Sequence, residues 1–167
     1  MLRTPGTLVV WPDNGIRVSA VLCLGLCLLT FAGCGGNRRS LFGGDSTVTT
    51  RIDPDANRNN PIALALVVVY DKKLLERLLA MPAREWFARR DQIRKDYPED
   101  EGFVSWEWEW VPGQEVPPQK LEFGVGARGG LVFADYVAEG DHRARFDPHQ
   151  NVLIHLQKDG FTAEAAP

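Results

Sequence analysis

The sequence predicts a mainly β protein, a β-sandwich with one or two short inserted helices, behind an exported leader. Short apolar runs recur at regular spacing after residue 46, and glycine, proline, aspartate and asparagine separate them. Residues 72–97 are the exception, because their leucines recur at helical spacing. The three cysteines, Cys23, Cys27 and Cys34, lie in or just after one apolar run. The region behind them therefore has no thiol for a disulfide or a zinc site.

The length and charge of the chain limit its architecture and its partners. A chain of 167 residues, 44% of them hydrophobic, can form one globular domain with tails. The formal net charge is −3, and basic and acidic residues are interleaved instead of gathered in blocks. The sequence has no basic patch of the kind that binds nucleic acid, so DNA and RNA are not expected partners.

Residues 1–33 are expected to form a lipoprotein signal peptide. Residues 18–33 carry no charge and follow Arg17, but the run is shorter than the about 20 residues of a membrane span. It ends in Phe31-Ala32-Gly33-Cys34, which resembles a lipobox, where bacteria attach lipid to the cysteine and cleave before it. Phe31 departs from the usual leucine. The alternative is a signal anchor, or an ordinary signal peptide in which Cys34 has no special role.

Lipid on Cys34 is expected to anchor the mature chain to a membrane. Each buried acyl CH₂ contributes about 0.8 kcal/mol, so several chains such as palmitate hold a protein almost permanently. The second mature residue is Gly35 rather than aspartate, which in enteric bacteria implies sorting to the outer membrane. Residues 34–45 are rich in glycine and polar groups and predict a flexible tether, with the sandwich domain over residues 46–167.

The first two expected strands differ in how they are buried. Ser46 to Ile52 alternates like a strand with one dry face, whereas Ile62 to Tyr70 is apolar on both faces and predicts a central strand. Four residues of the second strand are expected to face one side, against aromatics such as Trp108 and Phe133. These four are Leu64, Leu66, Val68 and Tyr70.

The expected helical insertion spans residues 72–97 in two pieces. The first piece carries Leu74, Leu75, Leu78 and Leu79 at helical spacing. Pro82 can open the second piece, which carries Trp86, Phe87 and Ile93, and Tyr97-Pro98 ends it. Further strands are expected at residues 104–110, 121–125, 131–137, 142–146, 152–156 and 161–163.

The strand at residues 104–110 has Trp106, Trp108 and Trp110 on one face and Glu107 and Glu109 on the other. The indoles could stack on sugar rings, or they could fill the core as half-buried strands require, and the core is the favoured interpretation. The two glutamates could do acid–base chemistry, but paired hydrolytic acids usually come from separate elements.

Other motifs give no clear chemistry, so no catalytic residue, metal or cofactor is expected. His142 and His155 lie in neighbouring expected strands, yet two histidines are too few for a specific metal site. The serines lack the spacing of known nucleophile motifs. The glycines in FGVGARGG, residues 123–130, lack the following Lys-Ser/Thr of a phosphate loop and predict a hairpin or bulge.

Taken in order, the lipobox, the alternating strand, the turn DPDANRNNP, the run IALALVVVYD and the leucine-rich helix resemble the TssJ family. These are small outer-membrane lipoproteins of the bacterial type VI secretion system. GLVFADY, HRARF and NVLIHL look similar to the family's closing strands. The resemblance covers most of residues 46–163 and indicates a divergent member.

The resemblance implies a transthyretin-like sandwich that binds the periplasmic part of a large inner-membrane protein and performs no catalysis. The family's contact loop maps onto Asp53 to Pro61, with Asn57, Arg58 and Asn59 expected at a projecting tip. The function expected is a structural lipoprotein on the periplasmic face of the outer membrane. The alternatives are a lipoprotein that binds saccharide or peptidoglycan through its tryptophan strand, and an unrecognised hydrolase.

Overall fold

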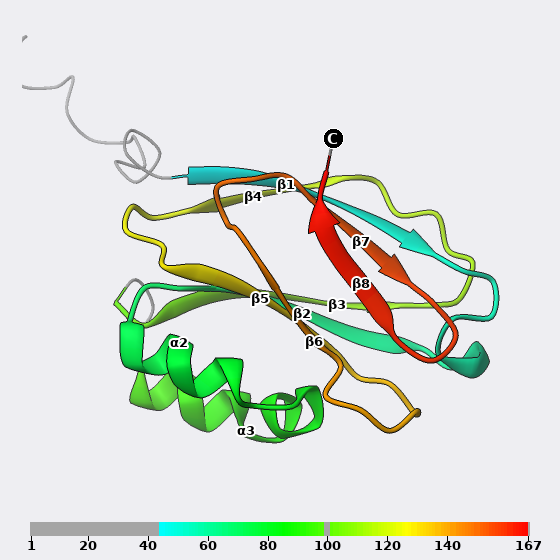
Figure 1. Ribbon diagram of the computed structural model, residues 1–167, viewed down its shortest axis with the longest axis horizontal. Coiled ribbons are helices and arrows are strands. Elements are labelled where there is room, and N and C mark those ends of the chain that lie inside the picture. Colours follow the sequence, from blue (N-terminus) through cyan, green and yellow to red (C-terminus); the bar gives the residue numbers. More distant parts are fainter. Residues whose placement is uncertain (1–43, 99–100, 167) are drawn as a thin grey trace, which may run out of the picture. The chain divides into compact units, whose positions relative to one another are not determined.

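Two four-stranded sheets packed face to face form the domain in the computed structural model, which describes residues 44–98 and 101–166 (Figure 1). The expected sandwich is therefore confirmed. The proposed signal peptide and Cys34 lie outside the described residues. The first strand begins at Gly44, two residues before the expected start of the domain at Ser46.

The strands divide between a β1 sheet and a β2 sheet. The β1 sheet has the order β4-β1-β7-β8, with β1 (Gly44–Ile52), β4 (Gln119–Phe123), β7 (Val152–Leu156) and β8 (Phe161–Ala165). The β2 sheet has the order β3-β2-β5-β6, with β2 (Ile62–Val69), β3 (Phe103–Trp110), β5 (Gly129–Ala134) and β6 (Arg143–Phe146). All neighbouring strands are antiparallel except β1 and β7, which run parallel.

Two helices cover the outer face of the β2 sheet, as Figure 1 shows: α2 (Lys72–Leu79) and α3 (Ala83–Asp96). Helix α2 starts where the Asp71 carboxylate accepts a hydrogen bond from the Leu74 backbone N–H. Helix α3 ends at Tyr97, before Pro98. The predicted two-piece insertion over residues 72–97 is confirmed.

Strand β2 is the centre of the fold, because apolar groups cover both of its faces. Leu64, Leu66 and Val68 belong to the core between the sheets, and Tyr70 packs against that core. Alternate residues of β2 instead join a second core beneath the helices, where Trp86 stacks on Phe133 with ring centroids 5.0 Å apart. The prediction of a strand buried on both sides is confirmed.

The expected contact of the Leu64 face with Phe133 is wrong. Phe133 is the register partner of Ala65, not of a residue pointing between the sheets, so its ring lies on the helix side. Trp108, the partner of Leu64, does pack against the core between the sheets. One position along a strand decides the face, because side chains alternate.

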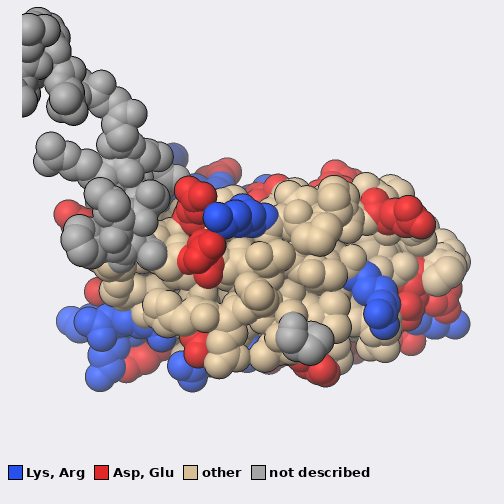
Figure 2. All heavy atoms as spheres, turned by 90° about the horizontal axis from the view of Figure 1, so that it is seen from above, with Lys and Arg blue, Asp and Glu red and all other residues tan. Residues whose placement is uncertain are grey.

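The outer face of the β1 sheet has no helix over it in the described part of the chain. Figure 2 looks down on this face, and residues without charge make up most of its middle. The alternating burial of β1 places Thr47 and Thr49 there, both half-buried. Threonine suits such a flat, partly wet sheet surface.

Strand register gives the sandwich two ends with different contents. The loop end consists of residues 53–61, 111–118, 135–142 and 157–160, which connect strands at the right in Figure 1. The chain-entry end contains Gly44 together with residues 124–128 and 147–151. The first described residue and the β1–β2 loop therefore lie at opposite ends of β1.

The glycine-rich stretch after β4 is not the expected hairpin or bulge. Strand β4 belongs to the β1 sheet and β5 to the β2 sheet, so residues 124–128 cross from one sheet to the other. Gly126 does have a positive φ, 86°, as expected for a glycine turn.

Candidate functional site

The β1–β2 loop contains a short left-handed turn. A one-turn helix, η2 (Ala56–Asn59), forms in the middle of the loop. Asn57, Arg58 and Asn59 have φ angles of 46°, 54° and 66°. Asparagine tolerates this region better than other residues with a Cβ, but arginine gains no such advantage. Three consecutive residues hold a conformation that the rest of the structure must stabilise.

Asn57 provides that stabilisation from inside the protein. Its side-chain amide donates a hydrogen bond to the Pro61 carbonyl at 2.8 Å, and its Oδ1 accepts one from the Val137 backbone N–H, also at 2.8 Å. Its backbone N–H donates to the Gln157 carbonyl. The residue is 1% exposed, so the expectation that Asn57 projects from the loop is wrong.

Arg58 and Asn59 are the residues of this turn that reach solvent. Arg58 Nε donates to the Asp159 carboxylate at 2.7 Å, and the two side chains are 56% and 57% exposed. Asn59 is exposed beside it. The structure thus brings together two of the three predicted contact residues at the surface, with Asn57 beneath them.

The base of the loop is fixed to the neighbouring strands. His155 Nε2 lies 2.8 Å from Asp53 Oδ1, and the Asp53 backbone N–H donates to the Leu156 carbonyl. The Gly113 N–H donates to the Asp53 carbonyl from the β3–β4 connection. These bonds hold the loop against β7 and against its neighbouring loop, as a preformed binding surface requires.

Two exposed valines flank the turn. Val137, whose backbone N–H donates to Asn57, is 51% exposed. Val111, 50% exposed, begins the β3–β4 connection that is hydrogen-bonded to Asp53. Sequence patterns did not mark Val137 as a surface residue, because it was expected to end a strand that in fact stops at Ala134. The loop end therefore combines a cation, an amide and two apolar side chains.

A hollow of about 430 Å³ continues this surface between the β5–β6 loop and the α2–α3 turn. The Ala83 N–H donates to the Asp141 carbonyl, and Arg143 donates to the Met81 carbonyl, so the turn and the loop are joined. His142 lines the hollow and stacks on Tyr136 with centroids 4.8 Å apart.

Tyr136 anchors the β5–β6 loop as a neutral side chain. It is 3% exposed and stacks on His142 and on Phe161. Burial raises the pKa of its hydroxyl well above the ordinary value, the Asp53 carboxylate raises it further, and the Gln157 backbone lowers it. The phenol therefore stays protonated and serves packing.

The two histidines considered for metal binding do not meet. His142 Nε2 lies 2.8 Å from the Ala138 carbonyl, whereas His155 bonds to Asp53. Within residues 44–98 and 101–166 there is no group of three or more potential ligands that could hold a metal ion.

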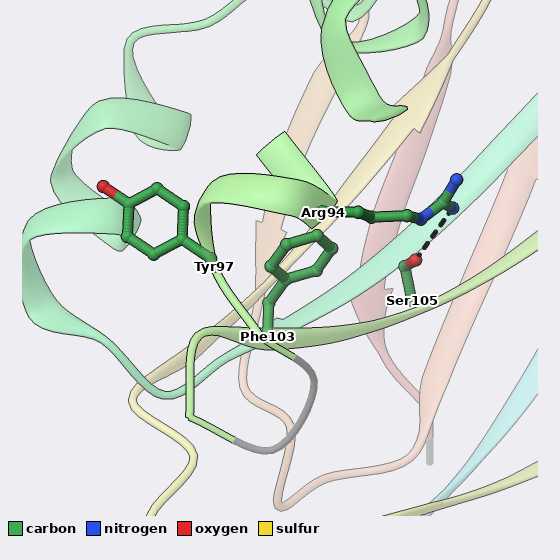
Figure 3. A pocket seen from close by; sticks show the side chains of 4 residues that line it. All are labelled: Arg94, Tyr97, Phe103 and Ser105. Carbon is green, nitrogen blue, oxygen red and sulfur yellow. Dashed lines mark hydrogen bonds between the residues drawn. The ribbon is translucent and has the colours of Figure 1, made fainter. Parts of the chain in front are cut away.

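The Glu107 carboxylate is held by helix α3. Glu107 makes ion pairs with Arg90 and Arg94 on α3, which neutralise its carboxylate. Arg94 also donates to Ser105, and with Tyr97 and Phe103 these residues line a hollow of about 260 Å³ (Figure 3). The carboxylate therefore fastens the helix to the edge strand.

The tryptophan strand packs inward as its alternation predicts. Trp106, Trp108 and Trp110 are half-buried against the core between the sheets, and Trp108 stacks on Trp110 at 6.2 Å. This placement supports core filling over a sugar-binding platform.

Among the described residues, no helix has the length and apolarity needed to cross a membrane.

Comparisons with known proteins find similar structures but no similar sequence. No family model matches the chain, and no curated protein matches it. Among solved structures, the type VI secretion lipoprotein TssJ1 from Pseudomonas aeruginosa is similar over 75% of this chain and 98% of its own, with 16% identity and a TM-score of 0.54.

Two further solved structures give the same result. Lip from Serratia marcescens, a membrane-bound component of the type VI secretion system, has 13% identity and a TM-score of 0.55 over 75% of this chain and 99% of its own. A chain of a type VI membrane complex has 11% identity and a TM-score of 0.51, over 75% and 98%. The resemblance inferred from the sequence is thus confirmed in the fold: this chain has the β-sandwich of the TssJ lipoproteins.

Proposed function

We propose that this chain is a divergent TssJ-family lipoprotein, a structural component of a type VI secretion membrane complex. Lipid on Cys34 would hold it to the periplasmic face of the outer membrane. Its loop end would dock the periplasmic part of an inner-membrane component. The shared fold and the order of leader, cysteine, tether and sandwich support this proposal.

The observation that carries the proposal is the separation of the two ends. The strand that follows the tether enters at Gly44, and the fixed, partly apolar loop with Arg58 lies at the opposite end of the same strand. A protein anchored at one end and rigid at the other can fix a partner to the membrane. Surface complementarity is sufficient for this role, and no catalytic group takes part.

Replacing Cys34 with serine is expected to abolish membrane attachment. Serine offers no sulfur for the lipid, and cleavage depends on prior lipidation. The chain should stop incorporating a fatty-acid analogue and leave the membrane fraction or remain uncut. Cys27→Ser, within the leader, is the matched control and should label like wild type. Equal label on the Cys34→Ser chain contradicts the anchor.

Changing Arg58 to alanine together with Asn59 to glycine is expected to weaken docking while sparing the fold. Glycine accepts the positive φ of position 59, and loss of the exposed Arg58–Asp159 pair costs at most about 1 kcal/mol of stability. The affinity for the partner should fall by about 1–3 kcal/mol if either residue is an anchor.

Recovery of the periplasmic partner from detergent extracts measures this effect. Arg89→Ala is the matched control, because it breaks an equally short ion pair, with Glu85, on helix α3 away from the loop end. Equal recovery by the double variant and by Arg89→Ala, at matched expression, would remove the β1–β2 loop as the docking site.

A further inference from the structure

The chain enters the domain beside the β4–β5 connection. Gly44 is the register partner of Phe123, the last residue of β4. A Cβ at Gly44 would lie only 2.5 Å from the Phe123 ring, so the entering backbone lies directly against that ring. Residues 124–128 therefore form the surface next to the point where the tether joins the domain.

Val125 is the most exposed large apolar side chain in the described part of the molecule, at 65%. Glycines stand on both sides of it, and Gly126, with φ 86°, turns the chain. A Cβ at Gly126 would meet nothing within 4 Å, so this turn projects into open space. The two residues next to Val125 in the chain are glycines, so neither has a side chain that could cover it.

Two arginines lie at the same end. Arg128 and Arg145 line a hollow of about 490 Å³ with Phe146, Asp147 and Pro148. Arg128 Nε donates to the Tyr70 carbonyl at 2.8 Å, which holds the base of the guanidinium in place and leaves its two terminal nitrogens to other acceptors. Asp147 offsets part of the positive charge of the two arginines. The remaining charge suits single phosphate groups, which arginine side chains bind well.

We propose that this end of the domain rests on the lipid headgroups of the membrane that holds the anchor. Val125 enters the boundary between headgroups and acyl chains, and Arg128 and Arg145 bind lipid phosphates. This contact rests on the proposed lipid anchor at Cys34. It gives the domain a fixed orientation, with the loop end directed away from the bilayer.

Because the tether keeps the domain close to the membrane, a weak contact with lipid is sufficient. Nine residues lie between Cys34 and Gly44, so the ten Cα–Cα steps that join them reach at most about 35 Å. A linker of this length gives an effective concentration in the millimolar range. The lipid surface is therefore the partner this end meets most often.

Single cysteines in the lipidated chain test the contact. In the mature chain Cys34 carries the lipid and is the sole native cysteine, so a thiol at position 125 takes a fluorophore alone. Val125→Cys is compared with Val111→Cys and Val137→Cys, exposed valines of the loop end. The chains are placed in vesicles of phosphatidylethanolamine with a minor part of phosphatidylglycerol, and nitroxide lipids and aqueous iodide serve as quenchers.

We expect nitroxide lipids to quench the label at position 125, and iodide to quench it poorly. The labels at positions 111 and 137 should show the reverse. Adding Arg145→Gln to Val125→Cys should lower the lipid quenching, because this exposed guanidinium is lost without removing the Arg128 bond to the backbone. Equal iodide quenching at all three positions in chains that float with the vesicles overturns the contact alone. If the parent chain does not float and its Cys34 thiol reacts with the dye, the anchor fails, and the contact fails with it.

Discussion

Replacing Val68 with aspartate should leave little of the domain folded at room temperature. Val68 is 1% exposed in the core between the sheets, with Val104 and Gly130 as its register partners on either side. A carboxylate buried there without a partner costs several kcal/mol. A domain of this size has a total stability of about 5–15 kcal/mol. Urea unfolding followed by circular dichroism measures the loss.

Val125→Asp is the matched control for that experiment. The same substitution at a 65% exposed valine should change stability by no more than about 0.5 kcal/mol. A Val68→Asp chain that unfolds at the same urea concentration as Val125→Asp would show that β2 is not the buried centre of the fold.

Replacing Asn57 with alanine should destabilise the domain by roughly 2 kcal/mol. The change leaves the Pro61 carbonyl and the Val137 N–H without their partner inside the protein, and because both bonds are only part-buried, each loss costs about 1 kcal/mol, the low end for such groups. The loop should loosen at the same time, since these bonds hold the left-handed turn. Thermal unfolding and protease cleavage within residues 53–61 report the two effects.

Asn59→Ala separates the contribution of the buried amide from that of the backbone. Both variants place alanine at a positive φ, so they share that backbone cost, but Asn59 has no buried amide to lose. Similar losses of stability in the two variants would show that the hydrogen bonds of Asn57 contribute little, and that the conformation alone sets the cost.

Local patterns were sufficient to predict the elements of this fold. The run over Ile62 to Tyr70 is apolar at every position except its end, which only a strand covered on both faces can bury. Leucines at helical spacing and Pro98 bounded the insertion to within a residue or two. Alternation alone placed the three tryptophans on one face of β3.

Contacts between distant segments could not be predicted in the same way. The parallel pairing of β1 with β7 joins residues about a hundred positions apart, and nothing in either strand specifies the partner. The same limit explains the error at Phe133, whose side depends on its register with β2. It also explains the glycine-rich connection, which reads like a hairpin until its two strands are assigned to different sheets.

The candidate site shows most clearly the difference between what local patterns predict and what distant contacts decide. The turn formers in DPDANRNNP identified the β1–β2 loop from composition, but polar residues in a turn were assumed to face water. Asn57 is buried because the β5–β6 loop and the Pro61 carbonyl offer partners for its amide, and those partners come from positions 61 and 135–137. The bond from the Val137 N–H to Asn57 also places Val137 at this surface.

The sequence by itself determined the strands, the helices and the apolar faces, together with the expectation of a leader that ends at Cys34, because each depends on residues close together in the chain. Only the tertiary structure decided which strands pair, which two of the three polar residues in the loop reach solvent, and which exposed valine shares an end with the tether. Those outcomes depend on hydrogen-bond partners and packing surfaces supplied by segments far away in the sequence.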